Sequence, residues 1–128
     1  MSKTPNYVGI QDGRLSPAFA AEPNNITTYE AGAYPKEAPL QYSGGIVEAK
    51  ADLIAVVNAM PGTQLITDDG DYLHFAFRSR LLRFVDDVEF LFDDENKQIH
   101  FRSASRSGYS DLNVNQTRMA EIRAAFER

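Results

Sequence analysis

The sequence contains no cysteine and no tryptophan, and it has no long apolar run. Without cysteine the chain can form neither a disulfide nor a thiolate metal site, and it has no thiol nucleophile. No apolar run approaches the roughly 18–20 residues of a transmembrane helix, so we expect no transmembrane segment. Basic residues are also few, because 13 Lys and Arg stand against 18 Asp and Glu, a net charge of −5. Non-specific nucleic-acid binding needs an extended basic face, so we expect no nucleic-acid partner.

Length and composition describe one small globular domain. The 128 residues are 43% hydrophobic and 24% charged, which is ordinary for a soluble domain. A chain of this length buries roughly two-thirds of its unfolded surface, enough for a single core. The N-terminus lacks the apolar region of a signal peptide. We therefore expect a cytoplasmic protein, or a periplasmic or otherwise exported one if a leader has been removed.

The first 43 residues differ in composition from the rest. Five of the six prolines lie there, without the periodicity of a helix or a strand. Proline has no N–H and fixes φ, so we expect this segment to be irregular. Its large apolar side chains are Tyr7, Ile10, Leu15, Phe19, Ile26, Tyr29 and Tyr34. They predict that residues 1–43 form an arm packed on a domain formed by residues 44–128; a disordered tail is the alternative.

Residues 44–128 alternate between helical and strand periodicity. Apolar residues at helical spacing predict helices over 46–60 and 115–126. Alternating residues separated by turn signals predict four strands, over 63–67, 72–79, 84–92 and 98–105. The fold predicted is α+β in two layers, a four-stranded antiparallel meander with both helices on one face. The element order is arm–α–β–β–β–β–α.

The expected strand registers bring polar side chains together on the face away from the helices. Centring the last hairpin on its turn places Glu89 opposite Arg102, and the middle pair places His74 beside Glu89. The candidate ligand-binding residues are His74, Asp87, Glu89, His100, Arg102 and Arg106. One interpretation of this face is a solvated surface with charge pairs. The other is a shallow site for a small anion or a protein ligand, between the face and the arm.

A second polar cluster is predicted on the helix side of the sheet. Asp86 has the parity of the core residues, so its carboxylate needs partners, such as Arg118 or a serine hydroxyl. Either Asp111 or Asn115 is expected to cap the second helix. This structural polar network comprises Asp86, Ser103, Ser105, Asp111, Asn115 and Arg118.

The loop before the third strand carries a mixed basic and apolar sequence, with Arg80, Leu81, Leu82, Arg83 and Phe84 in succession. In one interpretation the leucines tuck under the loop and the arginines stay solvated. In the other, Arg80–Phe84 docks a protein partner or, through Arg80, Leu81, Leu82 and Arg83, an anionic membrane surface.

Nothing in the sequence matches a nucleotide-binding, hydrolase or metalloprotease motif. We therefore expect no cofactor, no metal and no catalytic residue. The leading functional hypothesis is a non-enzymatic binding or accessory module with its ligand on the polar face. One alternative is a structural or assembly protein that docks through the Arg80–Phe84 loop. Another is a small hydrolase or isomerase with Glu89 as base, His74 as acid and Arg102 as anion anchor.

Two motifs carry a resemblance to a known family. The strand sequence FVDDVEF begins at Phe84, and RSASRSGYSD, followed by Leu-Asn-Val-Asn, begins at Arg102. Over about residues 40–127 the chain resembles domain-of-unknown-function family 1499, and Arg118 matches an arginine of that family's C-terminal helix. The chain departs from the pattern at Asn113 and Gln116, and its N-terminal stretch lacks the cysteines that many members have. The resemblance implies an α+β fold and assigns no activity.

Overall fold

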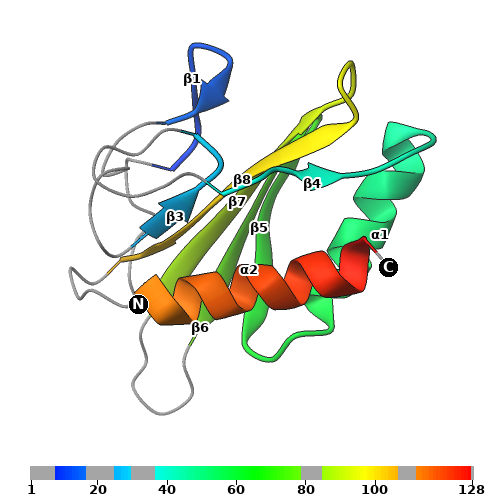
Figure 1. Ribbon diagram of the computed structural model, residues 1–128. Coiled ribbons are helices and arrows are strands. Elements are labelled where there is room, and N and C mark those ends of the chain that lie inside the picture. Colours follow the sequence, from blue (N-terminus) through cyan, green and yellow to red (C-terminus); the bar gives the residue numbers. More distant parts are fainter. Residues whose placement is uncertain (1–7, 17–24, 30–36, 79–84, 107–111, 128) are drawn as a thin grey trace.

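The computed structural model describes residues 8–16, 25–29, 37–78, 85–106 and 112–127. The described residues form two helices, four short strands and four longer strands. Figure 1 shows how these elements are arranged. The helices are α1 (Ile46–Asn58) and α2 (Leu112–Phe126). The four short strands are β1 (Ile10–Gln11), β2 (Arg14–Leu15), β3 (Asn25–Thr27) and β4 (Leu40–Gln41). The four longer strands are β5 (Thr63–Asp69), β6 (Tyr72–Arg78), β7 (Val85–Asp93) and β8 (Gln98–Ser105).

The sheet is larger than the predicted four-stranded meander. Strands β5 to β8 do pair in sequence order, but β3 and β4 both add antiparallel to the outer edge of β8, which gives six strands. A separate two-stranded sheet is formed by β1 and β2. The prediction of a four-stranded sheet is therefore wrong, although the α+β class is confirmed. The short strands escaped prediction because two or three residues are too few to show a period, and proline nearby is compatible with an edge position.

Both helices cover the same face of the six-stranded sheet, as the core between them shows. On α1 the buried residues are Ala49, Leu53 and Val57, which recur at helical spacing. On α2 Met119 and Ile122 are buried against the same cluster. The sheet supplies Leu73, Phe75, Val88, Phe90, Ile99 and Phe101, each fully buried. Burying such side chains stabilises the fold by roughly 1.5–3 kcal/mol each.

The strand registers agree with those expected from the sequence. Glu89 lies opposite Arg102 and Phe90 opposite Phe101 in the β7–β8 pair. His74 lies opposite Glu89 in the β6–β7 pair. Because side chains alternate between faces, these registers place Phe90 and Phe101 under the helices, and Glu89, Arg102 and His74 on the other face.

The second helix begins earlier than predicted. It starts at Leu112, not at Asn115, so Asn115 lies inside α2 and does not cap it. Asp111, the other proposed cap, lies outside the described residues. None of the described helices is long and apolar enough to cross a membrane.

Candidate functional site

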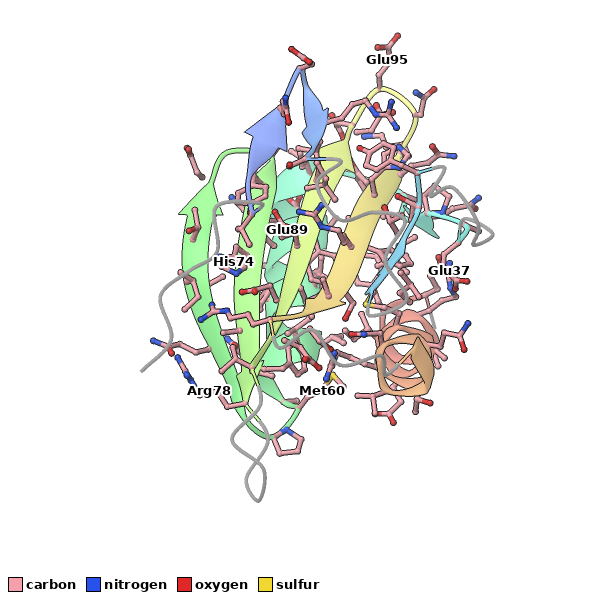
Figure 2. All side chains as sticks on the ribbon, turned by 90° about the vertical axis from the view of Figure 1, so that its left-hand side faces the viewer. Glu37, Met60, His74, Arg78, Glu89 and Glu95 are labelled. Carbon is pink, nitrogen blue, oxygen red and sulfur yellow. The ribbon has the colours of Figure 1, made fainter. Side chains whose placement is uncertain are left out.

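The polar face of the sheet is buried, not solvated. Among its charged side chains Glu89 is 0% exposed, while His74, Asp87 and Arg102 are each 1% exposed. The hairpin formed by β1 and β2 contacts this face through β7 and β8. Figure 2 shows His74 and Glu89 near each other in the middle of the sheet, with the β1–β2 hairpin at its upper end. The interpretation of this face as a solvated surface is therefore wrong.

Glu89 is the centre of the polar face. Its Oε1 accepts hydrogen bonds from Arg102 Nε at 3.1 Å and from Arg102 Nη2 at 2.6 Å. Its Oε2 accepts the Tyr72 hydroxyl at 2.6 Å and the Gly9 main-chain N–H at 2.7 Å. A buried carboxylate is tolerated only when it is paired and hydrogen-bonded, and these four donors meet that need.

The Glu89–Arg102 pair holds the β1–β2 hairpin by its main chain. The Ser16 N–H donates to the Gly9 carbonyl at 2.9 Å, which closes the base of the hairpin. The other two polar atoms at this base are the Gly9 N–H, which donates to Glu89, and the Ser16 carbonyl, which accepts from Arg102 Nη1. The carboxylate and the guanidinium therefore bind one main-chain donor and one main-chain acceptor, which lie just before β1 and just after β2.

The hairpin is closed by a tight turn at Asp12 and Gly13. Both residues have positive φ, 55° and 75°, as a two-residue type I′ turn requires. Glycine reaches this conformation without penalty and aspartate is one of the residues that tolerates it. Leu15 points back to the domain and is 3% exposed, whereas residues 10–14 are exposed.

A second ion-pair group lies beside the first on the same face. Asp87 accepts Arg106 Nε and Nη2, each at 2.9 Å, and its Oδ1 lies 2.7 Å from His74 Nε2. Burial by itself raises the pKa of Asp87, but the hydrogen bonds from His74 and Arg106 outweigh it, and the pKa is lowered. Asp87 is therefore an ionised carboxylate that binds both His74 and Arg106.

Tyr72 supplies a neutral donor to this face. Burial and the adjacent Glu89 carboxylate both raise the pKa of the Tyr72 hydroxyl far above its usual value of 10.0. The phenol thus stays protonated and donates to Glu89 throughout the physiological range.

His100 lies at the edge of the face and is not part of either ion-pair group. Its ring stacks on Tyr29, with centroids 4.7 Å apart, and its Nδ1 lies 2.9 Å from the Thr28 hydroxyl. The Arg14 guanidinium of the hairpin lies 4.1 Å from the centroid of the Tyr29 ring. Tyr29 therefore links the sheet to the hairpin at a second place, next to Leu15.

On the opposite face Asp86 forms the polar cluster expected there. Arg118 Nη2 donates to Asp86 at 2.7 Å, and Arg118 Nη1 donates to Ser103 Oγ and Asn115 Oδ1. The Ser103 hydroxyl also donates to Asn115 Oδ1 at 2.7 Å. Ser105 lies opposite Asp86 in the ladder and is buried. These contacts tie α2 to β7 and β8.

The structure places the six candidate ligand-binding residues in three separate arrangements. Glu89 binds Arg102, Asp87 binds both His74 and Arg106, and His100 contacts Thr28 and Tyr29. Among the described residues no three His, Asp or Glu side chains are arranged to hold a metal ion. The Arg80–Phe84 loop, proposed above as a docking element, lies outside the described residues.

The partners that sequence reasoning missed come from the first 30 residues. Gly9 and Ser16 reach Glu89 and Arg102 through main-chain atoms 80 and 86 residues away in sequence. Because any residue but proline offers such atoms, no side-chain pattern marks them. The one local signal was Asp12-Gly13, which is typical of a hairpin turn.

Comparison with known proteins places the chain in a family. The family described as "Protein of unknown function (DUF1499)" matches residues 14–126, which include β2, the long strands and both helices. Neither a curated protein nor a solved structure matches the chain. The match covers well over half of the sequence and includes both motifs that carried the resemblance. The chain belongs to the DUF1499 family.

Proposed function

We propose that the protein is a non-enzymatic binding module whose polar sheet face holds an extended protein segment by its main chain. The observation that carries this proposal is the double contact of Glu89 with the Gly9 N–H and of Arg102 with the Ser16 carbonyl. In this structure the bound segment is the chain's own β1–β2 hairpin. Recognition through main-chain atoms, with pockets for selected side chains, is an established mode of peptide binding.

The charges on the face favour a protein segment over a small anion. Arg102 is matched by Glu89 and Arg106 is matched by Asp87, each within 3 Å. An anion would have to compete with a buried carboxylate for each guanidinium, at a large electrostatic cost. A peptide group brings a donor and an acceptor together and suits a balanced carboxylate–guanidinium pair.

The same contacts argue against the enzyme alternative. Among the described residues Glu89 accepts four hydrogen bonds, two of them from the Arg102 guanidinium, so both of its carboxylate oxygens already bind groups of the chain itself. His74 is bonded to Asp87, not to Glu89, so the two groups do not form the proposed acid–base pair. Docking through Arg80–Phe84 stays a prediction.

The proposal can be tested with a peptide that carries the sequence of residues 8–16. In the full-length chain, Gly9→Pro removes the main-chain donor and cannot adopt the φ of 127° found at Gly9. Leu15→Asp places a charge where a side chain is buried. The chain with both changes, called the hairpin-released variant, should bind the fluorescently labelled peptide in an anisotropy titration.

The matched control adds Glu89→Gln and Arg102→Met to the hairpin-released variant. This control should bind the peptide at least ten-fold more weakly, because a hydrogen bond to a charged group contributes about 1.5–3 kcal/mol. Far-UV circular dichroism establishes that both proteins are folded. Equal peptide affinity for the two folded proteins, or no binding to either, refutes the proposed function.

A further inference from the structure

We infer that the polar sheet face takes the β1–β2 hairpin of a second copy of this chain, so that two copies exchange hairpins. This inference rests on the proposed function and names the partner of that same site. The face is complementary to residues 9–16, and each copy of the chain carries that segment. Any contact made within one chain can be made in the same geometry between two chains.

The domain binds side chains of the hairpin as well as its main chain. Leu15 is buried at 3% exposure, and Arg14 next to it lies over the Tyr29 ring. An arginine followed by a leucine therefore accompanies the Gly9 N–H and the Ser16 carbonyl in the set of recognised groups. This combination, in a segment that turns back on itself, is what a second copy of the hairpin supplies.

The hairpin is a self-contained unit that rests on the domain at its base. Its own ladder pairs Ile10 with Leu15 and Gln11 with Arg14. The tip is exposed, and the 49% exposure of Ile10 shows that this strand faces solvent. Figure 1 shows the β1–β2 hairpin projecting from the body of the protein, away from both helices. A unit of this kind can leave one face and join another without breaking its internal pairing.

Protein concentration decides whether the hairpin binds the face of its own chain or the face of a second copy. A segment tethered to its own binding site competes with a free one at an effective concentration on the order of 1 mM. The unaltered chain should therefore be monomeric at micromolar concentration and form exchanged dimers as it approaches the millimolar range. Blocking the internal arrangement should bring the exchange down to micromolar concentration.

The test mixes two full-length variants that complement each other. The hairpin-released variant, with Gly9→Pro and Leu15→Asp, has an intact face and no usable hairpin. The face variant, with Glu89→Gln and Arg102→Met, has an intact hairpin and an impaired face. Each alone should be monomeric by light scattering after gel filtration, and an equimolar mixture should give a 1:1 heterodimer. A face variant that also carries Leu15→Asp should give none.

The outcomes separate the two proposals. A mixture that stays monomeric while the labelled peptide still binds the hairpin-released variant overturns the exchange and leaves the proposed function standing. A heterodimer that survives Leu15→Asp in the face variant also overturns the exchange, because the interface then lies elsewhere. A second measurement needs no altered face: the unaltered chain should gain mass toward two chains at about 1 mM, and the Leu15→Asp chain should not. Equal masses for these two chains contradict the inference.

Discussion

The Glu89–Arg102 pair should be strongly coupled in stability, and a double-mutant cycle measures this directly. Arg102→Met removes two donors from a carboxylate that is 0% exposed, and of its donors among the described residues Tyr72 and the Gly9 N–H remain. Removing one partner of a buried pair destabilises a protein by about 3–5 kcal/mol, since the other charge stays buried without compensation. This is a large part of the roughly 5–15 kcal/mol that stabilises a domain.

Adding Glu89→Gln to Arg102→Met should recover part of this loss. The neutral amide oxygen can still accept Tyr72 and Gly9, and no uncompensated charge remains. We expect a coupling free energy of about 2–3 kcal/mol between the two positions. Because the chain has no tryptophan, urea unfolding is followed by far-UV circular dichroism. Additive effects, with a coupling free energy below about 0.5 kcal/mol, refute the idea that the two side chains act as one unit.

Two further predictions concern the other ion pairs. The pKa of Asp87 is lowered in the folded protein, so its contribution to stability is full above its unfolded pKa and is lost as pH falls through the folded pKa. The urea midpoint should therefore drop more for the unaltered chain than for Asp87→Asn between about pH 5 and pH 2. Parallel pH curves for the two proteins would contradict this. Arg118→Met leaves the Asp86 carboxylate, 8% exposed, without its guanidinium partner and should lower the free energy of unfolding by about 3 kcal/mol. The control Gln116→Met, at an exposed position of α2, should change that free energy by less than about 0.5 kcal/mol. Similar losses in both variants would show that the Asp86–Arg118 contact does not tie α2 to the sheet.

The helices and strands whose apolar residues recur at a regular spacing could be predicted from the sequence. The alternation in residues 84–92 and 98–105 fixes which side chains share a face, and Glu89 therefore lies opposite Arg102 as expected. The helix over 46–60 is found at Ile46–Asn58 because Pro61-Gly62 ends the run.

The part that could not be predicted depends on contacts distant in sequence. Strands β3 and β4 contain three and two residues, and only the free edge of β8 makes them strands. His74 lies opposite Glu89 in the ladder, yet its ring turns to Asp87, a choice made by side-chain geometry and not by register. The contact between the polar face and the hairpin has the same origin, because it is made by main-chain atoms of Gly9 and Ser16.

Changing one main-chain atom of the peptide shows whether the polar face binds a segment through its main chain. Two peptides with the sequence of residues 8–16 are compared in binding to the hairpin-released variant: one is unmodified and the other carries an N-methyl group on the residue equivalent to Gly9. We expect the methylated peptide to bind about 10- to 150-fold more weakly, because Glu89 loses a charge-assisted hydrogen bond of about 1.5–3 kcal/mol. Equal affinity of the two peptides would contradict it.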